Sequence, residues 1–403
     1  MSSAPKLIGF MPWLQLDRQY SAGGFTFVPF LDGSGAVNSC VAGLSAAFPA
    51  ILSSYYDERE RPRQNCMIVV DQSPQIPDEA WNLCEGRTDS IRWASSLLFL
   101  ASWAANEYFT PVGSYVNDTS FQLYFQRFTE PVDFVSLSYR KRDGRVLYGG
   151  PRHGEIHFTV PLNCSSCQFQ VETGFLAGLN AADAARSPVM QRLRAVLPLV
   201  RLANTDSDVM SLDSEAALMA FAFEQYFQAD TARDLAGKFD TLFAGYGKTT
   251  ALEAKAQRPG IYPDPDPRYT QAQLGWFVTK LWMLEFHQYR STVAHGGASS
   301  RTWGWSPFEH LVMAAFVFPL AVKLGLVKEG YYSLSRDDEI RCRAVDALLS
   351  KQDWADENGS SMNTNWQTII REQKRAVRIS AAVEKAVADL KAKGIVNPLE
   401  PDI

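Results

Sequence analysis

An arginine and a histidine five positions apart, Arg290 and His295, lie within the stretch QYRSTVAHGGASS (288–300). A histidine side chain transfers protons near neutral pH, and an arginine guanidinium stabilises negative charge through a rigid fork of donors. The same spacing recurs in RHGEIH (152–157). Spacing alone therefore does not identify a catalytic pair, and the elements that carry each pair must decide between them.

The second pair, in RHGEIH, lies in a stretch rich in turn-forming residues. Gly150, Pro151 and Gly154 surround it, and an alternating apolar and polar stretch follows. Glycine and proline at these positions are typical of a turn that leads into a strand. We therefore interpret RHGEIH as a solvated turn.

The first pair is expected at the end of a helix over 270–295. Apolar residues at 274, 277, 278, 281 and 284 have helical spacing, and Thr270 with Gln273 is typical of a capping box at its start. Gly296 and Gly297 predict its end. Five residues turn a helix by about 500°, which leaves the two side chains about 140° apart. A second copy of the helix, or fraying at the glycines, is required to bring both groups to one point.

Length and composition predict a soluble protein of two domains. The chain has 403 residues, 46% of them hydrophobic, and a net charge of −5. This charge excludes a generally basic nucleic-acid binder but not a local basic groove. We expect no secretory signal, and the longest apolar run, 311–322, is too short to span a bilayer and contains Pro319. These features predict a cytoplasmic protein without a membrane partner.

The two halves of the chain differ in their patterns. The first half predicts strands, a hairpin around Asp143 and Gly144, and one long helix; a further helix, broken near Pro49, is expected within 36–56. The expected strands cover 7–16, 24–30, 65–71, 121–128, 134–149 and 154–162, and the long helix covers 90–109. The later helices are expected at 180–203, 211–229, 231–245, 270–295, 306–324, 334–351 and 364–393.

The predicted fold is an α+β, β-rich amino-terminal domain followed by an all-α bundle. We expect a regulatory or sensor domain over 1–178, a helical connector over 179–209 and the helical domain over 210–403. In the connector, Pro188 fits a first helical turn and Pro198 is expected to end or kink the helix. Ser306 and Glu309 predict the start of another helix.

The helical half resembles the HEPN superfamily in its prokaryotic abortive-infection, ApeA-like branch. YRSTVAHGG (289–297) fits the family's arginine and histidine near a helix end, followed by glycine. EAALMAFAFEQYF (215–227) is similar to the family's first long helix with its buried glutamate, and WSPFEHLVMAAFVFPLAVKLGL (305–326) extends the similarity. The resemblance covers roughly 210–350. One departure is Ser291, where the family often has Asn, Asp or His.

The resemblance implies a metal-independent endoribonuclease that needs no cofactor and acts as a homodimer or higher even oligomer. The 2′-hydroxyl of single-stranded RNA would attack the neighbouring phosphate, with His295 transferring protons and Arg290 stabilising the phosphorane. Ser291 would contact phosphate or orient the histidine. Glu224 would pair with Arg290, or lie on the surface, and Tyr289 would stack a base, or pack in the core. The implied role is anti-phage defence or a toxin, with a phage-derived trigger at the amino-terminal domain.

Two other functions remain open. A non-catalytic protein could use the bundle for RNA binding, dimerisation or scaffolding, with Arg290 and His295 only capping the helix end. The chain could also be a toxin or target of a nucleotidyltransferase that modifies Tyr289.

Three further groups of residues could bind phosphate or a metal ion. Arg371, Lys374, Arg375 and Arg378 share one helical face and predict either a phosphate-binding stripe or a solvated face near Glu372. Cys164 and Cys167 form a single CxxC, which is more typical of two thiols in a turn than of a metal site. GYGKTT (245–250) resembles the end of a P-loop but has Leu242 in place of the required glycine, so it is not interpreted as one.

Overall fold

The chain forms two compact units in a computed structural model. Unit 1 comprises Met1–Tyr226 and Ala321–Tyr332, and unit 2 comprises Phe227–Leu320 and Ser333–Ile403. The described residues are 7–31, 48–57, 59–71, 85–106, 116–127, 135–141, 144–150, 157–159, 168–205, 210–258, 261, 272–295, 304–351 and 362–393.

The centre of unit 1 is an antiparallel sheet of five strands in the order β3-β4-β6-β1-β7. Their bounds are β1 Leu7–Met11, β3 Tyr20–Ala22, β4 Phe25–Leu31, β6 Asn65–Asp71 and β7 Tyr124–Arg127. In the register, Ile68 is paired with both Phe10 and Val28, so apolar side chains from three strands share one face. Sequence patterning predicted an amino-terminal sheet, and the structure confirms it.

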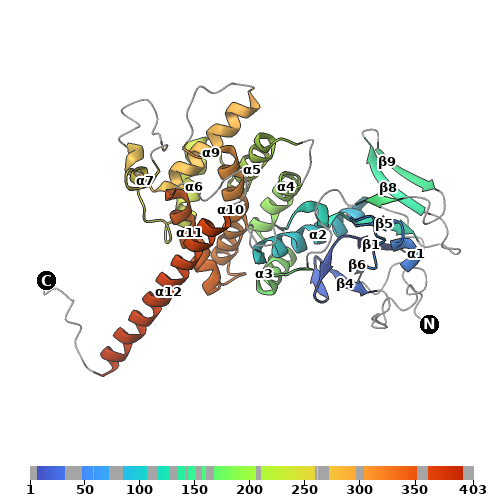
Figure 1. Ribbon diagram of the computed structural model, residues 1–403, viewed down its shortest axis with the longest axis horizontal. Coiled ribbons are helices and arrows are strands. Elements are labelled where there is room, and N and C mark those ends of the chain that lie inside the picture. The colour runs from blue at the N-terminus through green and yellow to red at the C-terminus, as the bar shows by residue number, and fades with distance from the viewer. Residues whose placement is uncertain are drawn as a thin grey trace. The chain divides into compact units, whose positions relative to one another are not determined.

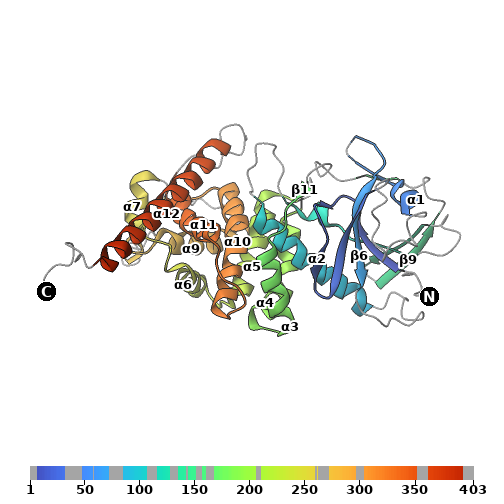
Figure 2. The same ribbon diagram turned by 90° about the horizontal axis from the view of Figure 1, so that it is seen from below.

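Each face of this sheet is covered by apolar packing. Helix α1 (Phe48–Leu52) closes one face, where Phe10 packs edge-on against Phe48 and Tyr55 at 5.5 and 5.3 Å between ring centroids. Helix α2 (Glu85–Ala105) lies beside the sheet (Figure 2). On the other face of the sheet, Arg92 of α2 lies over the ring of Phe125. The sheet is therefore buried on both sides, as its many Phe, Ile and Val residues require.

Several expected elements of the first half are shorter than predicted. The stretch 7–16 is divided into β1 and β2 (Gln15–Leu16), and 121–128 into a 3-10 turn at Asp118–Phe121 followed by β7. Pro49 lies in the first turn of α1, where its missing N–H is not required, and the part of the predicted helix before residue 48 lies outside the described residues. Three short ladders complete the unit. They are β8 (Val135–Lys141) with β9 (Gly144–Gly150), β5 (Tyr55–Tyr56) with β10 (Phe158–Thr159), and β2 with β11 (Gln168–Phe169).

Helices α3 (Thr173–Ala184) and α4 (Pro188–Ala203), together with α5 (Leu212–Phe227) up to Tyr226, belong to unit 1. The expected connector at 179–209 is thus part of a compact unit. Pro188 does occupy the first turn of α4, after the N-cap Ser187, but Pro198 does not end the helix. The loss of one backbone hydrogen bond at Pro198 is accommodated within a helix that continues to Ala203.

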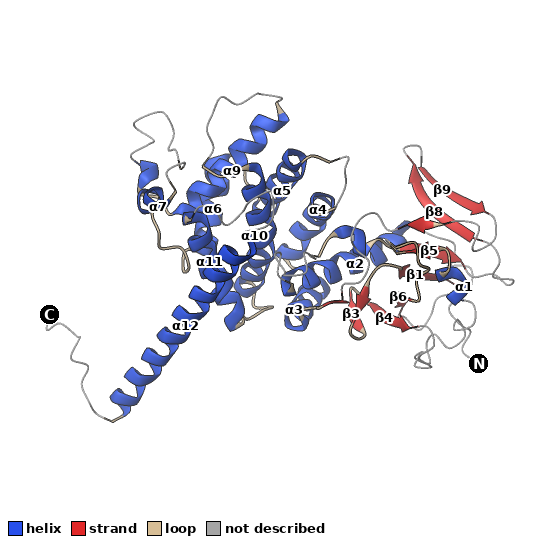
Figure 3. Cartoon of the chain, in the orientation of Figure 1, coloured by secondary structure: helices blue, strands red, loops and turns tan. Residues whose placement is uncertain are grey.

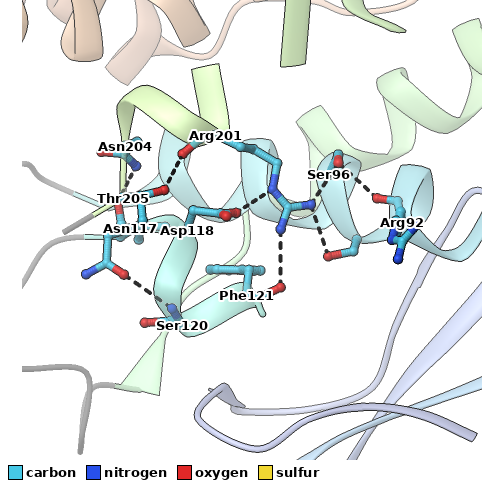
Figure 4. A network of polar contacts seen from close by, with 11 residues as sticks. Arg92, Ser96, Asn117, Asp118, Ser120, Phe121, Arg201, Asn204 and Thr205 are labelled. Atoms are coloured by element: carbon cyan, nitrogen blue, oxygen red, sulfur yellow. Dashed lines mark hydrogen bonds and ion pairs between the residues drawn. The ribbon is translucent and has the colours of Figure 1, made fainter. Parts of the chain in front are cut away.

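A partly buried polar network joins α4 to earlier elements of the chain. The guanidinium of Arg201 contacts the carboxylate of Asp118 and donates to Ser96 Oγ at 2.9 Å and to the Phe121 carbonyl at 3.2 Å (Figure 4). Asn204 Nδ2 donates to the Val116 carbonyl at 2.8 Å. These bonds join α4 to α2 and to the segment 116–121.

The described part of unit 2 contains helices and no strands (Figure 3). Its helices are α6 (Ala232–Phe243), α7 (Ala251–Gln257), α9 (Val278–Ala294), α10 (Pro307–Lys328, up to Leu320), α11 (Arg336–Ser350) and α12 (Met362–Ala392). Aromatic packing joins α6 to α9, with Trp282 5.8 Å from Phe239 and stacked on Phe286 at 5.4 Å. The predicted mostly helical second half is confirmed.

The helix that carries Arg290 and His295 begins later than predicted. Thr270 lies outside the described residues, and α9 starts at Val278. The cause is a backbone pairing: Ala251 N donates to the Trp276 carbonyl at 2.8 Å, and Val278 N donates to the Thr249 carbonyl at 2.9 Å. These bonds flank Phe277, which is extended with φ −65° and ψ 147°, so the helical turn at 272–274 does not continue into α9.

Helix α10 is long and apolar enough, by length and composition, to cross a membrane. It has 22 residues, so it extends beyond the apolar run noted in the sequence, and 89% of its most apolar window is buried inside the protein. Burial of this kind is typical of the core helix of a soluble protein.

Candidate functional site

The site predicted from the sequence lies at the carboxyl end of α9. Its buried face carries Leu281, Trp282, Phe286 and Tyr289 in helical spacing, and this face holds the helix against its unit. The last helical residue is Ala294, and His295 is the cap with φ −96° and ψ 6°; its N–H donates to the Ser291 carbonyl at 3.1 Å. The expected helix end is therefore confirmed to within the last turn.

The two predicted catalytic side chains differ in exposure. His295 is exposed at the helix end, whereas Arg290 is half-buried one turn earlier, with its Nε atom enclosed by protein. Ser291 is also half-buried. An exposed imidazole and a guanidinium each suit contact with an anion, but no described contact joins these two side chains within one chain. The glycines that follow lie outside the described residues.

Tyr289 is a core residue in this structure. Its side chain is 5% exposed, and its ring stacks on that of His310 with 5.4 Å between centroids. A ring that is buried and stacked in this way offers little surface to an RNA base or to a modifying enzyme. Of the two sequence interpretations of Tyr289, packing in the core is the one that the geometry supports.

Glu285 on α9 and His310 on α10 place a buried carboxylate close to a buried imidazole. The sequence did not indicate this pair. Glu285 Oε1 accepts from the Trp305 N–H at 3.0 Å and lies 3.6 Å from His310 Nε2, a distance too long for a hydrogen bond. His310 is fully buried, and neither ring nitrogen bonds to any described part of the chain. The pair therefore links α9 and α10 through close packing.

A buried ion pair, Arg258–Glu309, fixes the chain at the start of α10. Arg258 contacts both carboxylate oxygens of Glu309 and donates to the Gly304 carbonyl at 2.6 Å. Ser306 and Glu309 cap α10 reciprocally, as predicted, with bonds of 2.8 and 3.1 Å. Residues 304–309 are thus anchored by one guanidinium.

Glu224, the predicted partner of Arg290, is half-buried on α5 and belongs to unit 1. Arg290 belongs to unit 2, so the Arg290–Glu224 pair stays a prediction.

The basic residues of α12 share a solvent-facing surface. Arg371, Arg375 and Arg378 are exposed and Lys374 is half-buried, and none of them forms an ion pair with the described part of the chain. Glu372 instead pairs with Lys351 Nζ at 3.1 Å. Figure 1 shows that the last turns of α12 extend away from the neighbouring helices of its unit. Four cations on one face, none paired with a carboxylate among the described residues, form a surface that would attract polyanions.

The remaining sequence candidates have the following positions. Cys164, Cys167 and most of RHGEIH lie outside the described residues; His157 is exposed and rests on the ring of Tyr56 at 4.5 Å. Within the described ranges, no three His, Cys, Asp or Glu side chains are grouped closely enough to hold a metal ion. GYGKTT ends at Thr250, which is the N-cap of α7. Thr250 forms a capping box with Glu253, and this cap was not among the predictions from the sequence.

Comparison with known proteins gives no further assignment. No family model, no curated protein and no solved structure matches this chain.

Proposed function

We propose that the chain is a metal-independent endoribonuclease that cleaves single-stranded RNA through attack by the 2′-hydroxyl. The observation that carries the proposal is the placement of Arg290 and His295 at the open end of α9, the histidine exposed and the guanidinium one turn behind it. The resemblance of this segment to HEPN ribonucleases supplies the reaction class. The proposal does not depend on a pairing of Arg290 with Glu224.

The chemistry would divide between the two groups. His295 removes the proton from the 2′-hydroxyl or returns one to the 5′-oxygen that leaves, and Arg290 stabilises the negative charge of the phosphorane. The P–O5′ bond breaks as the 2′-O–P bond forms, which leaves a 2′,3′-cyclic phosphate and a 5′-hydroxyl. Ser291, whose carbonyl already accepts the His295 N–H, fixes the backbone at the histidine.

A dimer is part of the proposal because one helix aims the two side chains in different directions. Two copies would each contribute an arginine and a histidine to one cleft. Exposed apolar side chains on α12 support self-association: Ile379 is 54% exposed, Val383 56% and Leu390 44%. With Ala386 they follow the spacing of four, three and four residues that is typical of a coiled-coil seam.

The biological role that we propose is abortive infection or a related toxin activity in the cytoplasm. Unit 1 would then act as the regulatory part, with a phage-derived component as its trigger. Arg371, Lys374, Arg375 and Arg378 would bind the RNA backbone.

The decisive experiment combines purified protein with end-labelled single-stranded RNA, with and without EDTA, followed by analysis of the ends. We expect 5′-hydroxyl fragments whose formation EDTA does not reduce. His295→Ala is expected to lower the rate by about 10²- to 10⁴-fold, the range for loss of a general acid or base. Arg290→Ala should lower it by about 10²- to 10³-fold.

His157→Ala is the matched control, because His157 is also an exposed histidine but lies in unit 1. Its activity should equal that of the wild type. Fragments with 5′-phosphate ends, or cleavage that survives His295→Ala, would reject the proposed reaction.

The exposed apolar residues of α12, Ile379, Val383 and Leu390, also favour a second candidate function. In this function the protein is a scaffold that acts through self-association alone. Val383→Glu should convert the assembly to monomers in light scattering, whereas Leu252→Glu, at an equally exposed leucine on α7, should not. The scaffold function predicts that growth effects persist in His295→Ala and disappear in Val383→Glu. The ribonuclease function predicts that both variants lose them.

A further inference from the structure

Unit 2 contains a pocket that none of the predicted catalytic residues lines. It has a volume of about 280 Å³ and lies between the segment after α6, the carboxyl half of α11 and the middle of α12. Its walls include Tyr246, Lys248 and Thr249 from the first segment and Arg343 and Asp346 from α11. The stretch GYGKTT, which is not a P-loop, thus forms one wall of a real cavity.

The pocket carries an excess of positive charge. Its lining includes three cations, Lys248, Arg343 and Lys351, and one carboxylate, Asp346. Lys248 and Arg343 form no ion pair with any described residue, and the Nε atom of Arg343 is enclosed without a hydrogen-bond partner there. Lys351 Nζ forms an ion pair with Glu372 Oε2 at 3.1 Å, and both of these side chains are exposed. Two cations therefore remain uncompensated at one cavity of a protein with a net charge of −5.

The carboxylate is already engaged by the pocket wall and does not neutralise these cations. Asp346 accepts from Thr249 N at 3.2 Å and from Thr249 Oγ1 at 2.5 Å. Burial raises the pKa of Asp346, although the bonds from Thr249 oppose the change. Asp346 thus holds the Lys248–Thr249 backbone in place, where the lysine side chain remains exposed.

The chemistry of the lining is that of a phosphate site. A guanidinium fork matches phosphate oxygens, and a lysine adds a point charge without a geometric requirement. Tyr246 also lines the pocket, and its phenol hydroxyl, protonated at neutral pH, is a further donor. Small-ligand pockets usually begin at about 300 Å³, so a cavity of this size suits one sugar or nucleoside with its phosphate, not a dinucleotide.

We propose that this pocket binds a phosphomonoester of up to nucleoside-monophosphate size, with Arg343 and Lys248 holding the phosphate group. The site is separate from RNA cleavage, since it shares no residue with the Arg290–His295 motif. Binding and cleavage can consequently be tested independently on the same protein.

Equilibrium dialysis of the full-length chain against labelled AMP is the test, with unlabelled inorganic phosphate and adenosine as competitors. We expect AMP to be retained, phosphate to displace it and adenosine to displace it poorly. Lys248→Ala is expected to weaken AMP binding by about ten- to a hundredfold, the effect of losing one hydrogen bond to a charged group. Arg343→Gln should weaken it at least as much.

Lys385→Ala is the matched control, because it removes an exposed lysine from α12 outside the pocket lining. Lys248→Ala removes a solvent-exposed side chain, so it keeps the test valid even if Arg343→Gln disturbs folding. Absence of AMP retention at about 1 mM free ligand, a concentration at which even a weak site is half-occupied, overturns the proposal. Adenosine competing as well as AMP, or Lys248→Ala binding like the control, also overturns it.

Discussion

The ring of Tyr289 stacks on the ring of His310, with 5.4 Å between centroids and 26° between planes. Phe286 stacks on the same imidazole at 5.1 Å and 20°. Two turns of α9 thus rest on one side chain of α10 directly before Arg290. The position of the predicted catalytic arginine depends on this aromatic stack.

Substitutions at His310 distinguish how much the packing of its ring and how much its polar nitrogens contribute to the free energy of unfolding. His310→Ala is expected to lower the free energy of unfolding by about 3 kcal/mol, because it leaves a cavity among large rings. His310→Phe should cost less than about 1.5 kcal/mol, since the ring is kept and no hydrogen bond is lost. Urea denaturation of both variants measures the difference. Equal losses in the two variants would mean that the approach to Glu285, and not the stack, stabilises the site.

The buried Arg258–Glu309 pair gives a second stability prediction. Arg258→Met leaves the Glu309 carboxylate without its partner, and the free energy of unfolding is expected to fall by about 3–5 kcal/mol. Glu309→Gln should cost less, because the amide oxygen can still accept one bond from the guanidinium. Thermal and urea unfolding report both values. A loss below about 1 kcal/mol for Arg258→Met would show that the pair does not fix residues 304–309.

Local patterns in the sequence predicted local structure well. Strands β8 and β9 pair as an antiparallel hairpin with Lys141 opposite Gly144, and the Ser306–Glu309 cap starts α10. Both features depend on residues within a few positions of one another. The end of α9 at His295 belongs to the same class, because a helix cap is set by the residues next to it.

Contacts between distant segments could not be predicted in this way. Helical spacing from residue 274 onward favoured an early start of α9, but the bonds between 276–278 and 249–251 override it. Glu285 and His310 lie 25 positions apart on the apolar faces of two helices, where each resembles a stray polar residue. The pocket brings Lys248 to Arg343, which is 95 positions later on α11, so the sequence alone could not predict it.

Salt dependence tests the basic face of α12. For single strands, the logarithm of the binding constant falls by about 0.7 per neutralised phosphate for each unit of log salt concentration. The double variant Arg375→Ala/Arg378→Ala should therefore reduce the slope for a labelled RNA by about 1.4. Lys385→Ala/Lys391→Ala, also on α12, is the control of equal charge. Identical slopes for both double variants would mean that general charge, and not this face, attracts RNA.

The stability of unit 2 should depend on pH through Asp346. Burial raises its pKa above the unfolded value of 3.8, so the folded state binds more protons than the unfolded state between these two values. This contribution favours folding most below the unfolded pKa, and it is lost as the pH rises through the raised folded pKa. Asp346→Asn cannot ionise but keeps an oxygen that accepts from Thr249.

Relative to this variant, the wild type should become less stable between pH 3.5 and pH 7, as measured by urea unfolding at about five pH values. Asp389→Asn, at an exposed position of α12, is the matched control. A difference between wild type and Asp346→Asn that grows in favour of the wild type with rising pH would instead mean that the bonds from Thr249 outweigh burial.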